Sequence, residues 1–202
     1  MARRTRARRG EGDKLRQEIL EAAHELLVET GSQDAVSIRA IAERVGVTPP
    51  ALYMHFPDKD QLFFELCESY FQSFAGALED ATRSVDDPVE SLKRAGEAYI
   101  RFALENPEHY RVLFMSGGGT PPDRELTELA GFRCFMALVE QVQKAVDLGK
   151  FRPVEAFPTG VVLWASVHGL ASLLITDDHF PWPAVETLIR NQIETTIGGL
   201  LA

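Results

Sequence analysis

Residues 37–59, SIRAIAERVGVTPPALYMHFPDK, have the pattern of two short helices joined by a glycine turn. Ser37 precedes the first apolar residue, and its hydroxyl can accept a hydrogen bond from a free backbone N–H of the first helical turn. Apolar residues then recur at helical spacing on one face, at Ile38, Ile41, Ala42 and Val45. Gly46 follows, at a position where helices commonly end in a left-handed backbone conformation. This pattern predicts a helix that begins after Ser37 and ends before Gly46.

The second half of the same stretch predicts another helix. Thr48 can serve as its N-cap, and the two prolines that follow occupy the first helical positions, where a missing N–H costs nothing. We expect the helix to continue to Phe56 and to end at Pro57. Asp58 and Gln61 then form a D-x-x-Q capping box, which predicts the start of a long helix.

The run from residue 37 to residue 62 resembles the DNA-binding domain of the tetracycline-repressor-like (TetR) family. The residues that carry the resemblance are Ile41, Ala42, Gly46, Val47, Leu52, Tyr53, Phe56, Lys59 and Leu62. The resemblance extends back through the preceding helix and covers the first third of the chain. It implies a helix-turn-helix whose second helix enters the major groove. It also implies that Tyr53 and Lys59 occupy positions that contact the DNA backbone.

The net charge of −9 is unevenly distributed along the 202 residues. Residues 1–60 carry ten Lys or Arg and ten Asp or Glu, whereas residues 61–202 carry eleven against twenty. Five arginines lie within the first nine residues with no acidic residue among them, at Arg3, Arg4, Arg6, Arg8 and Arg9. This cluster fits either a flexible arm that follows phosphates or enters a minor groove, or a tail that only aids solubility.

Apolar residues recur at helical spacing along the rest of the chain, and no segment alternates as a strand would. We therefore expect an all-α protein of about nine helices. Residues 1–60 are expected to form a three-helix helix-turn-helix DNA-binding domain with the arginine arm, and residues 61–202 a helical effector-binding and dimerisation domain. Long helices are expected over 58–82 and 123–148. In the resembled family, the helix at 58–82 connects the domains and transmits the ligand signal.

Outward positions of the helix-turn-helix supply the candidate DNA contacts. They are Ser37, Arg39, Thr48, Pro49, Tyr53, His55 and Lys59, together with Arg3, Arg4 and Arg6 of the arm. Tyr53 and His55 can donate to phosphates, and Lys59 can neutralise one. Thr48 can reach a phosphate or a base edge. The alternatives are that Tyr53 only packs and that Lys59 is only a solvated charge.

Pro49 and Pro50 depart from the family pattern, which often has a polar or basic residue or Gly there. Proline has no hydrogen-bond donor, so side-chain hydrogen bonds to bases are expected to be few. We expect specificity to depend on Thr48, on apolar contacts to thymine methyl groups, on the arginine arm and on DNA shape.

Aromatic and apolar residues of the C-terminal helices are candidates for an effector site. They are Phe71, Phe74, Tyr99, Phe102, Phe114, Phe132, Phe135, Met136, Trp164 and His168. Such residues also form ordinary cores, so the ligand site is implied by the resemblance, and an apolar or aromatic effector would suit them. Trp164, His168 and Gly169 resemble the WHG type of C-terminal domain in this family. His168 is either a structural histidine or a ligand contact, and we expect no metal and no cofactor.

One helix-turn-helix contacts one half-site, so the protein is expected to be a homodimer. The helix expected over 155–175 and the last helix, from residue 184, are strongly apolar, and small residues allow close helix approach. The interface candidates are Ala165, Gly169, Ser172, Leu188 and Gln192. The alternative is that these helices only complete the core of one protomer.

The sequence predicts a ligand-responsive dimeric transcription regulator, by family default a repressor released from double-stranded operator DNA by a small apolar or aromatic effector. The alternative is a helical effector sensor or adaptor that acts through protein partners without sequence-specific DNA binding. An enzyme is not expected, because no G-x-S-x-G motif, paired metal ligands or dinucleotide-binding motif occurs. We also expect no secretory signal and no membrane-spanning run, and hence a cytoplasmic protein.

Overall fold

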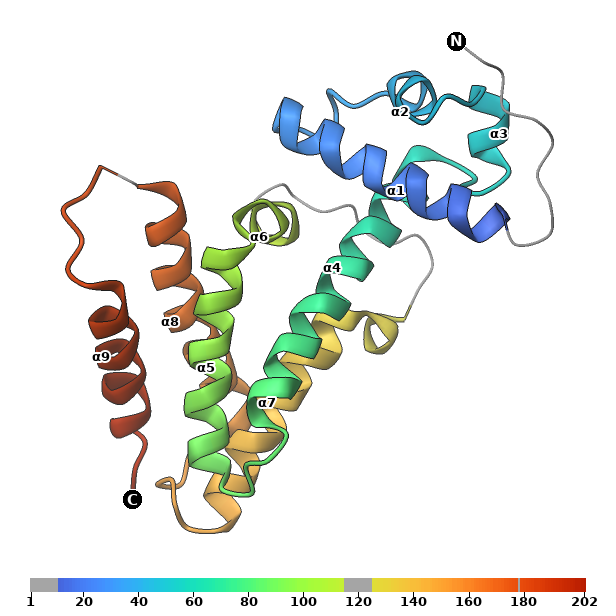
Figure 1. Ribbon diagram of the computed structural model, residues 1–202. Coiled ribbons are helices and arrows are strands. Elements are labelled where there is room, and N and C mark those ends of the chain that lie inside the picture. The colour runs from blue at the N-terminus through green and yellow to red at the C-terminus, as the bar shows by residue number, and fades with distance from the viewer. Residues whose placement is uncertain (1–10, 115–124, 178) are drawn as a thin grey trace. The chain divides into compact units, whose positions relative to one another are not determined.

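The computed structural model describes residues 11–114, 125–177 and 179–202. These residues form nine α-helices and one 3₁₀-helix, with no β-strand (Figure 1). The helices are α1 (Glu11–Thr30), α2 (Ile38–Val45), α3 (Pro49–Tyr53), α4 (Lys59–Thr82), α5 (Pro88–Glu105), α6 (Pro107–Phe114), η1 (Leu126–Glu128), α7 (Ala130–Asp147), α8 (Ala156–Thr176) and α9 (Val185–Gly198). The all-α class predicted from the sequence is confirmed.

The chain divides into two compact units, and the division falls inside α4, between Tyr70 and Phe71. Among the described residues, the first unit comprises 11–70 and 111–114, and the second comprises 71–110, 125–177 and 179–202. α4 therefore contributes to both units. The functional boundary at residues 60 and 61 stays a prediction.

A single hydrophobic cluster forms the core of the first unit. It is built from the apolar stripe of α1 and inward residues of the other helices, including Ile19, Ala23, Leu27, Ile41, Ala42, Leu52, Phe56, Leu62, Phe63, Leu66 and Val112. On α1, His24 lies edge-on to Tyr70 of α4 with ring centroids 5.5 Å apart, and His24 Nδ1 shares a hydrogen bond with the Tyr70 hydroxyl. α1 and the start of α4 thus support α2 and α3 from behind.

The turn between α2 and α3 has the predicted backbone. Ser37 Oγ accepts a hydrogen bond from the Ala40 N–H at 3.1 Å and so caps α2. Gly46 has φ 78° and ψ 31°, in the left-handed region. The Val47 N–H donates to the Ala42 carbonyl at 2.9 Å, which satisfies a carbonyl at the helix end.

Gly46→Ala is expected to lower the free energy of unfolding by about 1–2 kcal/mol, because an L-residue is strained in the left-handed region. A Cβ at Gly46 would have no atom within 4 Å, so the cost lies in the backbone and not in packing. Gly76 lies inside α4, also in open space, and is the matched control. Gly76→Ala is expected to stabilise the protein by about 1 kcal/mol. Chemical denaturation measures both, and shifts of the same sign would contradict this explanation.

Two helices are shorter than predicted. The helix expected to reach Phe56 ends at Tyr53, because the proline at 57 disfavours helical conformation in the residue before it. The helix expected from Asp123 begins at Ala130 in the structure, and Asp123 itself lies outside the described residues. The 3₁₀-helix η1 and one extended residue precede α7.

Two predicted caps form only in part. Thr48 takes the N-cap position of α3, but its side chain makes no capping hydrogen bond, and the Ala51 N–H donates to the Thr48 carbonyl at 2.9 Å. The second proline of α3 also has no N–H to offer. At α4, Asp58 Oδ1 accepts from the Gln61 N–H at 2.7 Å, as predicted. The Gln61 side chain, however, does not complete the box by accepting from the Asp58 N–H; its Nε2 donates to Glu65 Oε1 at 2.9 Å.

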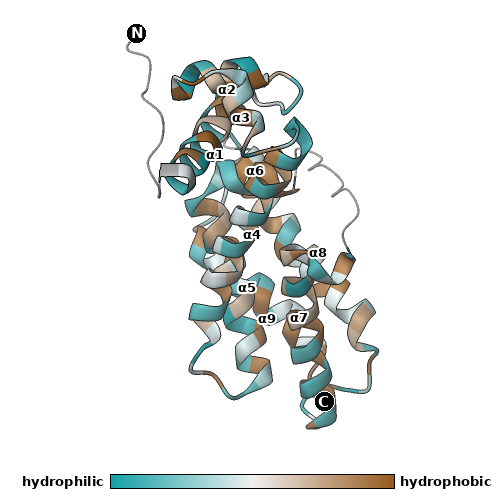
Figure 2. Ribbon diagram, turned by 90° about the vertical axis from the view of Figure 1, so that its right-hand side faces the viewer, coloured by the Kyte–Doolittle hydropathy of each residue, from teal (hydrophilic) through white to brown (hydrophobic). Residues whose placement is uncertain are grey.

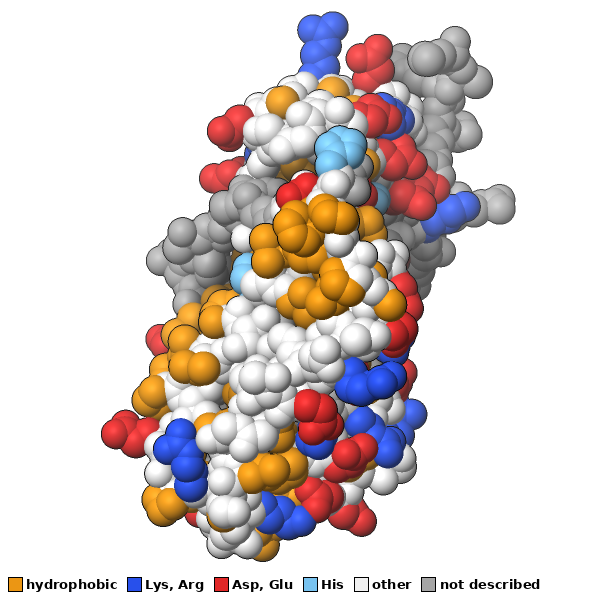
Figure 3. Space-filling model, turned by 90° about the vertical axis from the view of Figure 1, so that its left-hand side faces the viewer, with side chains coloured by type: hydrophobic (Ala, Val, Ile, Leu, Met, Phe, Trp, Pro, Cys, Tyr) orange, Lys and Arg blue, Asp and Glu red, His pale blue; other side chains and the backbone are white. Residues whose placement is uncertain are grey.

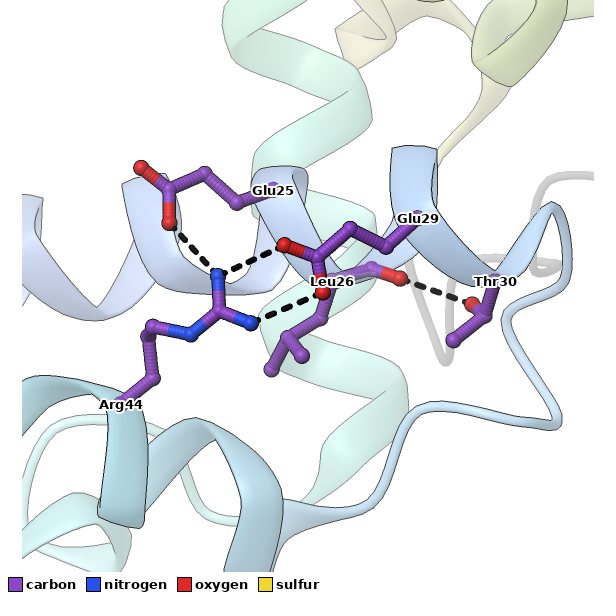
Figure 4. A network of polar contacts seen from close by, with 5 residues as sticks. All are labelled: Glu25, Leu26, Glu29, Thr30 and Arg44. Carbon is purple, nitrogen blue, oxygen red and sulfur yellow. Dashed lines mark hydrogen bonds and ion pairs between the residues drawn. The ribbon is translucent and has the colours of Figure 1, made fainter.

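Arg44, in the last turn of α2, is bound to α1 by two carboxylates (Figure 4). Its Nη1 donates to Glu25 at 2.9 Å and to Glu29 at 3.0 Å, and its Nη2 donates to the other Glu29 oxygen at 2.8 Å. The hydrogen bonds hold the pKa of Glu29 below its usual value and raise that of Arg44. These contacts hold α2 against α1 and occupy the guanidinium.

The second unit packs α5, α7, α8, α9 and the C-terminal part of α4 around its own core. Figure 2 shows both hydrophobic and hydrophilic residues on these helices. A Cβ on Gly96 of α5 would lie 2.5 Å from Ile193 Cδ1 of α9, so glycine permits this close approach. On the exposed edge of the same pair, Arg101 donates to both carboxylate oxygens of Glu186 at 2.9 and 2.6 Å.

Candidate functional site

α3 buries one set of side chains and exposes another. Leu52 and Phe56 are fully buried, whereas Tyr53 is 50% exposed and Met54 is 85% exposed. Within the described part of the chain, the Tyr53 hydroxyl has no hydrogen-bond partner. It is therefore available to a ligand on the outer face of the helix-turn-helix.

Most cations of the helix-turn-helix are already neutralised. Residues 11–60 carry five Lys or Arg. Three of them pair with carboxylates: Lys14 with Glu18, Arg16 with Glu65, and Arg44 with Glu25 and Glu29. Arg16 also lies over the Phe56 ring, 4.8 Å from its centroid. Arg16 joins α1 to α4 and Arg44 joins α2 to α1, whereas Lys14 pairs within α1.

The two remaining cations of residues 11–60 are Arg39 and Lys59, and neither forms an ion pair within the described residues. Arg39 is exposed in the first turn of α2. Lys59 opens α4, with its Nζ 5.8 Å from the centroid of the Phe63 ring. Both were assigned to DNA from the sequence, and the structure leaves their charge uncompensated.

The other residues predicted to contact DNA differ in their exposure and in whether their polar groups already form hydrogen bonds. The Ser37 hydroxyl already accepts from Ala40, so it is committed to the cap. The Thr48 hydroxyl is exposed and makes no side-chain hydrogen bond among the described residues. Pro49 and His55 are half-buried. The role of each in DNA binding stays a prediction.

Arg3, Arg4 and Arg6 lie outside the described residues. The charge of the residues that follow them bears on this prediction. Residues 11–60 carry five Lys or Arg against ten Asp or Glu, a balance of −5. A surface with this balance repels a polyanion at long range. That the arm offsets this repulsion in DNA binding stays a prediction.

Comparison with known proteins agrees with this geometry. Residues 19–66, which include α2, α3 and the start of α4, match the family described as bacterial regulatory proteins, tetR family. Residues 92–196, more than half of the chain, match the family described as tetracyclin repressor-like, C-terminal domain. The chain belongs to the tetR family. The resemblance noted from residues 37–62 is thus confirmed.

Three proteins illustrate its place in the tetR family. The HTH-type transcriptional activator FasR of Mycolicibacterium smegmatis is 31% identical over 110 residues, which cover 54% of this chain and only half, 50%, of FasR. The nucleoid occlusion factor SlmA of Vibrio campbellii is 26% identical over 143 residues, covering 71% of this chain and 72% of SlmA. The regulator PfmR from Thermus thermophilus has the same fold, with a TM-score of 0.68 at 27% identity over 91% of this chain and 99% of PfmR.

In this tetR-family protein, the W-x-x-x-H-G motif forms a hydrogen-bonded cluster with two tyrosines. Trp164 Nε1 donates to the Tyr99 hydroxyl at 3.3 Å. The hydroxyls of Tyr99 and Tyr110 lie 3.1 and 2.6 Å from His168 Nδ1. The cluster joins α8 to α5 and to α6. Tyr110 was not among the predicted site residues, because no local pattern points to a partner 58 residues away.

Burial sets the protonation of this cluster. It raises the pKa of Tyr99 and Tyr110, that of Tyr110 to about 12, and it lowers the pKa of His168. Burial thus disfavours the charged imidazolium of His168, and the tautomer of the neutral ring decides whether Nδ1 accepts from the tyrosine hydroxyls or donates to one of them. This arrangement fits the structural reading of His168, and a ligand-contact role stays a prediction.

The other predicted effector residues are only partly brought together. Phe74 lies edge-on to Tyr99 and Phe102, with ring centroids 5.1 and 5.3 Å apart. Phe114 belongs with the first unit and is not grouped with them. The half-buried candidates of the second unit are Phe71, Phe132, Phe135 and Met136.

An open hollow of about 540 Å³ lies elsewhere in the second unit. It is lined by Asp87, Val89, Glu90, Lys93, Gly149, Lys150, Leu201 and Ala202. No predicted effector residue lines it. Its two lysines are paired, Lys93 with Glu194 at 2.8 Å and Lys150 with Asp87. The hollow does not match an apolar effector.

α8 exposes large hydrophobic side chains at Phe157, Val161, Val162, Trp164 and Leu173. Val162, Gly169 and Leu173 share one face at helical spacing. A Cβ on Gly169 would have no atom within 4 Å. Ala165, another residue predicted to lie in the dimer interface, is exposed. Figure 3 shows hydrophobic side chains gathered on the side of the second unit where α8 and α9 lie. This face is available to a partner.

The remaining interface candidates, Ser172, Leu188 and Gln192, are half-buried. Gln192 Nε2 donates to Thr196 at 3.1 Å, but its buried Oε1 accepts from nothing in the described residues. An unpaired buried acceptor costs about 1–3 kcal/mol. A donor from another protein surface would remove that cost.

α8 is also long and apolar enough to cross a membrane, with a mean hydropathy of 1.6 over an 18-residue window. The expectation that no such run exists was wrong for Ala156–Thr176. Length and composition alone do not distinguish a membrane span from an amphipathic or interface helix. Only 22% of the window is buried within the protomer, which fits a helix that meets a second surface.

Proposed function

We propose that the protein is a homodimeric, ligand-responsive transcription regulator that binds palindromic operator DNA through α2, α3 and the start of α4. One observation carries this proposal. Arg39 and Lys59 have no acidic partner on a helix-turn-helix whose other cations, among residues 11–60, are paired. Two such surfaces in a dimer would meet half-sites about 34–36 Å apart, or a multiple of that distance.

We further propose that it is a repressor released by a small apolar or aromatic effector bound in the second unit. Because α4 contributes to both cores, an effector that favours one arrangement of α4 changes how the helix-turn-helix surfaces are presented. Effector and operator would then weaken each other's binding by the same factor. Such a regulator acts in the cytoplasm, where its operator lies.

Selection of duplexes from a random double-stranded library by the purified protein tests the core of the proposal. Enrichment of a two-fold symmetric site, bound by two protomers with affinity that falls steeply with salt, is expected. If no duplex is enriched at low salt, DNA regulation is rejected. A reporter driven by the enriched promoter then gives the sign of regulation, which matters because the relative FasR is named an activator.

A second function has one observation in its favour. The balance of −5 over residues 11–60 is unusual for a DNA-binding surface, and the relative SlmA is named for nucleoid occlusion and not for transcription. The protein would then be an effector sensor or adaptor that acts through protein partners. Failure to enrich any duplex, together with intact effector binding, would favour this function.

Lys59→Ala and Tyr53→Phe are expected to weaken binding to all duplexes alike. Lys59→Ala should lower affinity by about 10-fold and reduce the salt slope by about 1 for each half-site, because one phosphate contact is lost. Tyr53→Phe removes only the hydroxyl, so a smaller loss of about 3–5-fold with an unchanged salt slope is expected. Fluorescence anisotropy at several salt concentrations measures both values.

Lys144→Ala is the matched control, because Lys144 is an exposed lysine on α7 in the second unit. It should leave the affinity and the salt slope unchanged. An effect of Lys59→Ala confined to one base position, or equal effects of the two lysine variants, would contradict the phosphate assignment.

A further inference from the structure

An apolar ridge runs along the outer side of α3 and past its end. Pro50 is exposed in the first turn, and Met54 follows four residues later. Met54 lies just beyond the helix, with φ −71° and ψ −20°, and the His55 N–H donates to the Leu52 carbonyl at 2.9 Å. Because the helical turn continues, Pro50 and Met54 share one face while Leu52 points into the core.

The exposed fraction of Met54 is 85%, higher than that of any other large hydrophobic residue that the structure describes. A flexible thioether side chain in water is poised to gain free energy from contact with an apolar surface. It lies in the same segment as Tyr53, which is also exposed. A surface that covers Tyr53 and Thr48 therefore also meets Met54.

The chemistry of α3 restricts which feature of DNA this ridge can recognise. The helix PPALY contains no amide, guanidinium or carboxylate side chain. Asn, Gln and Arg are the side chains that form bidentate hydrogen bonds with adenine or guanine, and none is present there. The apolar group that a base presents in the major groove is the 5-methyl group of thymine. Pro50 and Met54 are complementary to that group and to no hydrogen-bonding edge.

We propose that Met54, supported by Pro50, is a specificity-determining residue that recognises the 5-methyl group of a thymine in each operator half-site. This inference rests on the proposed function, because it assigns one base contact within that DNA-binding surface. Met54 contributes by apolar contact alone. Removing the methyl group from that thymine and truncating Met54 therefore remove the same contact.

The test uses the full-length protein and the duplex that the wild-type protein enriches from a random library. Each thymine is replaced in turn by deoxyuridine, which lacks only the methyl group, and affinity is measured by fluorescence anisotropy. For the wild-type protein, one thymine in each half-site is expected to show a loss of about 3–5-fold on replacement. For Met54→Ala the loss at that thymine disappears, while losses at other thymines remain.

Two further variants sharpen the result. Leu148→Ala truncates another exposed hydrophobic residue, 64% exposed, in the second unit, and should reproduce the wild-type uracil profile. Met54→Gln keeps the length but introduces an amide, so repeated selection should replace thymine at that position, with adenine favoured. The inference is overturned if Met54→Ala keeps every uracil penalty, or if Met54→Gln enriches the wild-type site. Enrichment of no duplex by the wild-type protein would instead reject the proposed function itself.

Discussion

Replacement of the five arginines in the first nine residues by alanine is expected to lower operator affinity by at least about 100-fold at 0.15 M salt. Without them, residues 11–60 carry five cations and ten anions, and three of the five cations are already paired with carboxylates. Arg39 and Lys59 alone cannot offset that repulsion. The salt slope should fall by several units, since each protomer loses up to five phosphate contacts.

Anisotropy titrations at salt concentrations between about 50 and 300 mM, where counterion release dominates binding, measure the loss of affinity and the change in salt slope. A variant with all five arginines changed to lysine is the matched control. It should keep most of the salt slope, because the charge is retained, but lose preference for narrow A·T-rich minor grooves, where arginine is favoured. An alanine variant with an unchanged slope would show that the arm is only a solubilising tail.

Val162→Asp is expected to convert the proposed dimer into monomers and to abolish operator binding at nanomolar protein. Val162 is 61% exposed on the face of α8 that also carries Gly169 and Leu173, so a carboxylate there would be buried without a partner in the proposed interface. A monomer reaches one half-site only. Loss of the linked second contact weakens binding by about 10²–10⁴-fold.

Light scattering coupled to size exclusion gives the mass of each variant, and circular dichroism shows that the fold is intact. Leu148→Asp serves as the control, because Leu148 is 64% exposed in the same unit but lies at the end of α7. It should remain dimeric and bind operator normally. A dimeric Val162→Asp variant would reject the α8 face as the interface and leave α8 as a helix of the protomer core.

Several helix ends could be predicted because single residues determine them, although α3 and α7 are shorter than predicted. Gly46, which the sequence placed at a helix end, has positive φ, as do Gly31 and Gly149 in the described chain. Prolines likewise open α3, α5 and α6. The prediction failed where a side chain could form a hydrogen bond with either of two partners. Gln61 bonds to Glu65 one turn ahead, a choice that local pattern cannot decide.

The DNA-binding surface was less predictable, because the sequence does not show which arginines form ion pairs within the protein. Arg39 and Arg44 lie on the same short helix, yet Arg44 is bound by carboxylates 15 and 19 residues away on α1 while Arg39 is not. That distinction depends on how α1 and α2 pack. The effector site was harder still, since aromatic residues fill cores whether or not a cavity exists, and the Tyr110–His168 contact spans 58 residues.

The first unit is discontinuous in the chain, and this constrains how the protein can be cut or recombined. Val112 is buried in the hydrophobic cluster of α1 to α4, although it follows α5 in the sequence. A single protease cleavage, or a single crossover placed after α4, therefore leaves the DNA-binding fragment with an open gap where Val112 and Leu113 had been. A chimera that gives this regulator another protein's sensor needs two junctions, so that the end of α6 travels with its own DNA-binding fragment.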